Sequence, residues 1–155
     1  HGSGSSRLSP RNRFVAQGLQ RRGLSTLLFD LLTEDEAEDR ANVFDIALLA
    51  DRVLEALDAL AEALPQCPPL GLFGASTGAA AALVAAASRP QAVRAVVSRG
   101  GRPDLAGDAL ARVRAATLLI VGGADTEVLA LNRAAYARLE CDRRLEIVPG
   151  ATPPD

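Results

Sequence analysis

The pentapeptide Gly74-Ala75-Ser76-Thr77-Gly78 constrains the fold of this chain more than any other segment does. It follows the short apolar run Pro69–Phe73 and precedes the alanine-rich run Ala79–Ala87. These flanks predict a strand that turns sharply into a helix, with the glycines allowing the two backbones to approach closely. Such a turn points the serine hydroxyl into a cleft, so Ser76 is the first candidate for a nucleophile.

Two simpler interpretations compete for the same turn. It is also compatible with a glycine-rich turn in which Ser76 or Thr77 caps the following helix. A phosphate-binding turn at a helix N-terminus is the weaker alternative, because the lysine of a P-loop is missing.

The rest of the chain predicts strands that alternate with helices. A helix is expected over Pro10–Arg22 with Ser9 as its N-cap, followed by a strand at Leu24–Phe29. The acidic stretch Thr33–Arg40 is interpreted as a solvated loop, and Asn42 as the cap of a long helix that ends before Pro65. The remaining predictions are strands at Ala92–Ser98, Thr117–Val121 and Arg144–Val148, a short helix near Leu110 and a helix at Glu127–Leu139. This order predicts an α/β fold, a three-layer α/β/α sandwich with a mostly parallel sheet whose ligands bind beyond the carboxyl ends of the strands.

Composition narrows the function classes. With 155 residues and 48% hydrophobic residues, the chain is expected to form one domain over 1–155 with a proper core. A net charge of −2 disfavours nucleic acid as a partner. No apolar run is long enough to cross a bilayer and no charged leader is recognised, so we expect a cytoplasmic protein with no membrane partner. Cys67 and Cys141 lack metal-ligand spacing and are interpreted as idle thiols.

Acyl transfer by a serine also needs donors for the developing oxyanion. The run His1-Gly2-Ser3-Gly4-Ser5-Ser6 has the form of an oxyanion loop, in which His1, Gly2 and Gly4 are structural. The backbone N–H groups of Ser3 and Thr77 are the predicted oxyanion donors. The same run also resembles the remnant of an affinity tag and linker, and this alternative stays open.

An orienting acid and a substrate anchor can be sought at the same sheet edge. Asp125 directly follows a predicted strand and suits the acid role, although it also fits the N-cap of the next helix. Asp104 is the substitute acid. Arg99 and Arg102 follow another strand and either bind an anionic group of the substrate or, through a pair with Asp104, brace the glycine loop.

In these motifs the chain resembles the α/β-hydrolase superfamily, and within it the dienelactone-hydrolase-like domains found fused to bacterial phosphoribosyltransferases. The resemblance implies hydrolysis of a small-molecule ester, thioester or lactone through an acyl-serine, with no cofactor or metal and with a phosphoribosyltransferase as a fused or separate partner. The segments that carry it are His1–Ser6, Ser9–Arg13, Leu28–Asp30, Gly71–Ala80 and Ser98–Pro103.

Two departures from this family pattern shape the functional expectation. Similar domains place their catalytic histidine in a Pro-Gly-Ala-Thr-His motif, where this chain has Pro153, and the one histidine, His1, belongs to the oxyanion loop instead. We therefore expect little activity, and a non-catalytic interaction or regulatory domain is the alternative.

The family also places a strand between those at Leu24 and Leu70, and this strand is not recognised here. The chain is accordingly interpreted as a fragment that lacks the N-terminal strands and the C-terminal histidine loop and helix, or as a domain that self-associates.

Overall fold

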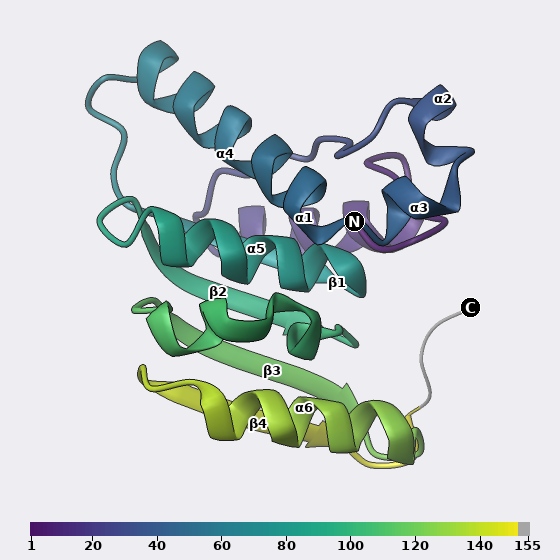
Figure 1. Cartoon of the computed structure of the whole chain (residues 1–155). Helices are drawn as coiled ribbons and strands as arrows, with labels where there is room; N and C mark the ends of the chain where they lie inside the picture. Colours follow the sequence, from purple (N-terminus) through teal and green to yellow (C-terminus); the bar gives the residue numbers. More distant parts are fainter. Residues whose placement is uncertain (152–155) are drawn as a thin grey trace.

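A four-stranded, fully parallel sheet with the order β1-β2-β3-β4 forms the centre of the computed structural model, which describes residues 1–151. The strand order follows the sequence because each crossover segment carries the chain to the adjacent position (Figure 1). The strands are β1 (Leu70–Ala75), β2 (Val93–Arg99), β3 (Ala116–Gly122) and β4 (Arg143–Val148). The helices are α1 (Pro10–Arg21), α2 (Glu34–Ala37), α3 (Arg40–Val43), α4 (Ile46–Ala63), α5 (Thr77–Ser88), the 3-10 helix η1 (Pro103–Arg112) and α6 (Thr126–Arg138).

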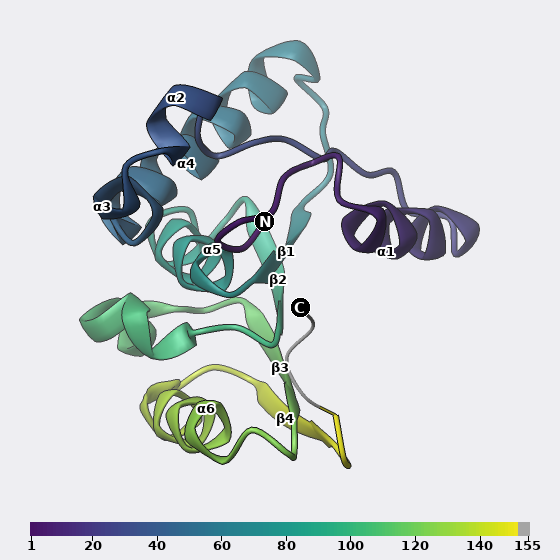
Figure 2. The ribbon, with the colours of Figure 1, turned by 90° about the vertical axis from the view of Figure 1, so that its right-hand side faces the viewer.

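The helices are distributed unequally over the two faces of the sheet. Figure 2 shows α5, η1 and α6 along one face, with α4 next to α5 on the same side and beyond the β1 edge, while α1 lies on the other side. Successive crossovers of one hand place their helices on the same face, which explains the arrangement of α5, η1 and α6. The predicted α/β sandwich with a parallel sheet is confirmed, and among residues 1–151 α1 is the one helix on the second face.

The core lies between the sheet and α5. Nearly every residue of α5 is buried, and its alanines allow it to approach the strands closely. On β3, Leu119 and Val121 are buried under the helices, whereas Leu118 and Ile120 are half-buried. This alternation follows from the period of two along a strand, and it shows which face carries the helices.

The predicted strand at Leu24–Phe29 is wrong. The segment has no regular secondary structure, and within the described chain Leu24 bonds back to Leu19 of the preceding helix turn rather than to a strand. Leu24 and Leu27 are each 56% exposed. A β-strand exists only through a neighbour that satisfies its backbone groups, and no strand borders this segment among residues 1–151.

The N-terminal boundary of the long helix was also predicted wrongly. Asn42 belongs to the short helix α3, and α4 begins at Ile46 with Asp45 as its cap. The Asp45 carboxylate accepts the N–H of Leu48 at 3.0 Å, which satisfies one of the free donors of the first turn.

The acidic stretch predicted as a solvated loop contains the helix α2. Thr33 and Glu36 form a reciprocal capping box, with the Glu36 N–H donating to Thr33 Oγ1 at 3.2 Å. Glu36 also forms an ion pair with Arg52 at 2.6 Å, which holds the pKa of Glu36 at about 2. The segment is therefore ordered by a cap and by an ion pair to α4.

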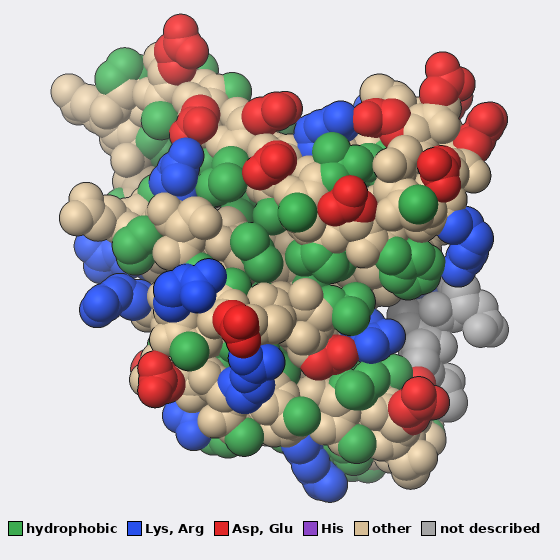
Figure 3. Space-filling model, in the orientation of Figure 1, with side chains coloured by type: hydrophobic (Ala, Val, Ile, Leu, Met, Phe, Trp, Pro, Cys, Tyr) green, Lys and Arg blue, Asp and Glu red, His purple; other side chains and the backbone are tan. Residues whose placement is uncertain are grey.

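Across residues 1–151, no helix combines the length and apolar character needed to span a membrane. The same residues contain no cluster of three or more His, Cys, Asp or Glu side chains placed to hold a metal ion. On the face seen in Figure 3, basic side chains are interspersed with acidic and neutral ones and form no continuous stripe.

Candidate active site

Ser76 occupies a strained turn between β1 and α5. Its φ of 53° makes it the one non-glycine residue of the described chain with a positive φ. Such a conformation costs on the order of 1–3 kcal/mol and persists only where surrounding contacts hold it. The Ser76 hydroxyl forms no capping hydrogen bond to α5. The alternative in which this serine caps the helix is therefore not supported. The predicted strand–turn–helix is confirmed.

Close backbone packing explains the glycines of the turn. A Cβ atom on Gly74 would lie 2.6 Å from the carbonyl oxygen of Gly78, and a Cβ on Gly78 would overlap the carbonyl of His1. Distances this short are sterically forbidden, so both positions require glycine for β1, α5 and the N-terminal segment to meet.

The N-terminal loop lies directly against the turn. A Cβ atom on Gly2, which is buried, would lie 2.7 Å from Ser76 Cβ. The His1 ring donates from Nδ1 to its neighbouring carbonyl, Gly2 C=O, at 3.0 Å, and its Nε2 accepts the N–H of Leu31 at 2.9 Å. These partners assign a neutral imidazole with its proton on Nδ1, so neither nitrogen is available to Ser76.

The two predicted oxyanion donors occupy different surroundings. Thr77 is buried at the first turn of α5, where backbone N–H groups have no acceptor within the helix. Ser3 is exposed in a turn closed by the N–H of Ser5 and the carbonyl of Gly2 at 3.2 Å. Gly4 has a φ of 70°, which this turn requires and which glycine adopts readily.

The loop after β2 contacts the serine through its backbone. The N–H of Arg102 donates to the carbonyl of Ser76 at 3.1 Å. The Arg102 guanidinium forms a two-point pair with Asp104, at 3.0 Å from Nε and 2.9 Å from Nη2, and this pair raises the pKa of Arg102. The bracing interpretation of Arg102 is therefore what the structure shows, and the substitute acid Asp104 is already occupied.

Arg99 has different surroundings. Its Nη2 lies 3.4 Å from Asn12 Oδ1, and its guanidinium stacks over the Phe73 ring at 5.6 Å. Its Nε and Nη1 are buried without an acceptor among residues 1–151. Burial lowers the pKa of Arg99, and the charge of Arg11 lowers it further. Two of the guanidinium's donors are therefore unsatisfied within the part of the chain that the structure describes.

Asp125 follows β3 and caps α6. One carboxylate oxygen accepts the N–H of Val128 at 3.0 Å, which is the predicted N-cap. The loop before it is tied to the chain that leaves β4, because the N–H of Ala124 donates to the carbonyl of Ala151 at 3.2 Å. The chain beyond β4 therefore starts beside Asp125, and Pro153 lies outside the described residues.

Sequence reasoning missed Asn132. This α6 residue is fully buried, and its Nδ2 donates to the carbonyls of Gly101 at 3.2 Å and Val128 at 2.9 Å. A signal was present, since Val128, Asn132 and Ala135 recur at helical spacing and place an amide on the apolar side of the helix. A buried amide needs partners, but the sequence does not reveal which loop supplies them.

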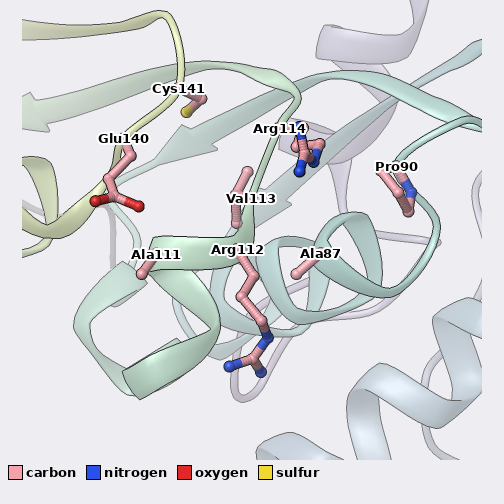
Figure 4. Close-up of a pocket in the computed structure, with 8 residues that line it drawn as sticks. All are labelled: Ala87, Pro90, Ala111, Arg112, Val113, Arg114, Glu140 and Cys141. Carbon is pink, nitrogen blue, oxygen red and sulfur yellow. The ribbon is translucent and has the colours of Figure 1, made fainter.

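Two hollows lie near the surface. One of about 570 Å³ is lined by residues including Ala87, Val113 and Cys141 (Figure 4), and it lies at the amino ends of the strands, away from Ser76. The other, of about 630 Å³, is lined by the N-terminal loop and the start of α1, from Ser3 to Arg11. The second hollow includes Ser3 of the loop that packs on Ser76, but Ser76 itself is not among its lining residues.

Comparisons with known proteins agree with this geometry. The family model described as the alpha/beta hydrolase fold matches residues 1–147. The structure of a dienelactone hydrolase from Anabaena variabilis is 57% identical and superposes with a TM-score of 0.93, covering 98% of this chain and 73% of that one. A dienelactone hydrolase-like phosphotriesterase from metagenomic libraries, at 22% identity and a TM-score of 0.71, covers 93% of this chain and 66% of that one and shares the fold.

A further similarity concerns longer proteins. Two Mycobacterium tuberculosis proteins, from strains CDC 1551 and H37Rv, are named as phosphoribosyl transferases and are 60% identical over 153 residues. The match covers 98% of this chain, which spans only 34% of the length of each relative. The family model covers residues 1–147, which is nearly the whole sequence, so the chain belongs to the alpha/beta hydrolase fold family.

Proposed function

We propose that this domain is a serine hydrolase scaffold that acts on an ester, thioester or lactone through an acyl-Ser76 intermediate. The observation that carries the proposal is the strained conformation of Ser76, with His1 and Gly2 packed against the same turn. A positive φ at a serine is costly, and such strain clusters at active sites. The hydrolase-type scaffold and the similarity to a dienelactone hydrolase support this assignment.

The proposed reaction is acyl transfer in two steps. Ser76 Oγ attacks the acyl carbon, its proton passes to a base, and the alcohol or thiol leaves with a proton from that base. Water then attacks the acyl-serine and releases the acid. The N–H groups of Thr77 and Ser3 are the proposed donors to the oxyanion, and Asp125 is the proposed acid that orients the base.

This chain supplies no imidazole for the proton transfer. His1 is its one histidine, and both ring nitrogens are engaged by Gly2 and Leu31. A serine hydroxyl without a base is a poor nucleophile near pH 7. Loss of one triad member typically leaves only about 10³–10⁴-fold catalysis over water, so we expect the sequence as it stands to be nearly inactive.

Arg99 is the proposed anchor for an anionic group of the substrate. It retains buried donors with no acceptor in residues 1–151, whereas Arg102 is saturated by Asp104. Of the two arginines suggested by the sequence, the contacts therefore support only Arg99 in this role.

A second function is a non-catalytic interaction or regulatory domain on the same scaffold. It is favoured by the name of the longer mycobacterial relatives, of which this chain matches 34%. In this case the domain would associate with a phosphoribosyltransferase, fused or separate. Co-purification of the two proteins should then be the same for the chain and for Ser76→Ala.

We also propose that further polypeptide completes the sheet. The segment 25–29 has no strand partner in the described chain, and β1 is the edge of the sheet on that side. One additional strand between them would satisfy both sets of backbone groups. It would come from a longer protein that contains this domain, or from self-association.

Acetylation by p-nitrophenyl acetate tests the hydrolase proposal. We expect slow acetylation located on Ser76 by peptide mass mapping, faster acetylation when imidazole is added as an external base, and none in Ser76→Ala. Acetylation distributed over other residues, with no dependence on Ser76, would reject the nucleophile assignment.

A further inference from the structure

Asn132 reaches from the middle of α6 to the loop after β2. Its side chain is 0% exposed, and Nδ2 donates to the carbonyl oxygens of Gly101 and Val128. Both partners are acceptors, which fixes the orientation of the amide with its nitrogen toward them. The hydrogen bond to Gly101 joins α6 to a loop that lies 31 residues earlier in the sequence.

The bond to Gly101 acts on the same peptide group that contacts Ser76. The carbonyl of Gly101 and the N–H of Arg102 belong to one planar unit, so holding one edge orients the other. Asn132 binds the carbonyl edge at 3.2 Å, and the N–H edge donates to the carbonyl of Ser76 at 3.1 Å. A hydrogen bond to the carbonyl also polarises the peptide and strengthens its N–H as a donor.

This peptide has little freedom to adopt another position. A Cβ atom on Gly101 would lie 2.6 Å from Ala79 Cβ and would overlap Ser98 Oγ, so the loop backbone is packed against α5 and β2. The other backbone donor to the Ser76 carbonyl is the N–H of Ala79 at 3.2 Å, which lies within the first turn of α5. Of these two hydrogen bonds to the Ser76 carbonyl, the one from the Arg102 N–H comes from a different part of the fold.

We propose that Asn132 is a positioning residue for Ser76, acting through the Gly101–Arg102 peptide. The amide holds the peptide plane, the N–H of that peptide holds the carbonyl of Ser76, and these contacts help to keep the serine in its strained, positive-φ conformation. The inference rests on the role proposed for Ser76 above. It predicts that removing the amide changes the chemical environment of residue 76 and not only the stability of the fold.

A thiol at position 76 can report this environment without any catalytic base. In a Ser76→Cys chain with Cys67→Ser and Cys141→Ala, the rate of alkylation by iodoacetamide as a function of pH gives the pKa of the new thiol. A thiol at a helix N-terminus has a lowered pKa. We expect Asn132→Leu to raise this pKa by about one unit, which lowers the thiolate fraction, and with it the alkylation rate near pH 7, about tenfold.

Thr117→Val is the matched control. Thr117 is also buried, its Oγ1 donates to the carbonyl of Ala115 at 2.9 Å, and it lies near the amino end of β3, away from Ser76. Its loss should reduce stability without moving the pKa of the thiol.

If Asn132→Leu does not fold, Asn132→Ala is measured in its place. An unchanged pKa in the folded Asn132 variant, or an equal shift in Thr117→Val, would overturn the proposal. The result is readable even if Ser76 never forms an acyl intermediate, because alkylation measures the environment and not turnover.

Discussion

Gly78 lies against the backbone of His1, so closely that a single added methyl group on Gly78 would overlap the carbonyl oxygen of His1. This contact joins the N-terminal loop to the first turn of α5, the same turn that begins at Ser76. The proposed oxyanion loop and the proposed nucleophile are therefore parts of one packed unit, and a change at their junction should affect both.

Replacing Gly78 by alanine should destabilise the domain. The added Cβ must displace the His1 backbone, and overpacking of this kind costs about 1–3 kcal/mol. Urea denaturation followed by circular dichroism measures the change. Gly18→Ala in α1 is the control, because nothing lies within 4 Å of its Cβ position and alanine favours a helix by about 0.5–1 kcal/mol. Equal stability of the two variants would contradict the observed contact.

The Glu36–Arg52 pair predicts a pH dependence of stability. The ion pair lowers the pKa of Glu36 from 4.5 to about 2, so the folded state binds its proton less readily than the unfolded state does. The stabilisation is complete above the unfolded pKa of 4.5 and is lost as the pH falls toward 2. Thermal melts between pH 6 and 2.5 should therefore show a steeper loss for the natural chain than for Glu36→Gln. Glu34→Gln, on the same helix, serves as the comparison, and parallel curves for all three proteins would refute the assigned pair.

The segment 25–29 should exchange its backbone hydrogens rapidly. Its amides have no strand partner in the described chain, whereas β3 is paired on both sides. Hydrogen exchange followed by mass spectrometry should show peptides from 25–29 exchanging many times faster than peptides from β3. If the protein self-associates through this edge, protection of 25–29 will rise with protein concentration. Strong protection in a dilute monomer would mean that the segment pairs in a way the structure does not show.

The two arginines should respond differently to small carboxylates. If Arg99 holds an anionic group, benzoate should raise the melting temperature of the natural chain and of Arg102→Gln, but not that of Arg99→Gln. Arg102→Gln should lower stability because it leaves Asp104 without its two-point partner. The same benzoate response in Arg99→Gln would remove Arg99 from the substrate site.

The sequence predicted most reliably what depends on local residues. The turn at Ser76 was predictable because the glycines and their strand and helix flanks are adjacent in the chain. The cap of α4 was missed because Asn42 and Asp45 are both good caps three residues apart. In the structure Asn42 lies inside α3, whose own cap is Asp39, and Asp45 caps α4. The prediction of a strand at Leu24–Phe29 was wrong for a different reason. A strand forms only where a neighbouring strand pairs with it, and the local residues do not specify that neighbour.

Residues that act over a distance were the hardest to predict. Asn132 donates to a loop 31 positions earlier in the chain, and the sequence gives no indication of that partner. The choice between bracing and substrate binding for Arg102 likewise depended on whether Asp104 turned toward it. In each case the residue type was visible in the sequence, while the contact that gives it a role required the tertiary structure.

Labelling with a fluorophosphonate probe shows whether Ser76 is a nucleophile. We expect a Pro153→His chain that carries the C-terminal residues of the dienelactone hydrolase relative to be phosphonylated at Ser76. The chain with its own sequence should be labelled very slowly, and Ser76→Ala should not be labelled. Absence of labelling in the folded histidine-bearing chain, or labelling that persists in its Ser76→Ala variant, would contradict the assignment of Ser76 as a nucleophile that awaits its base.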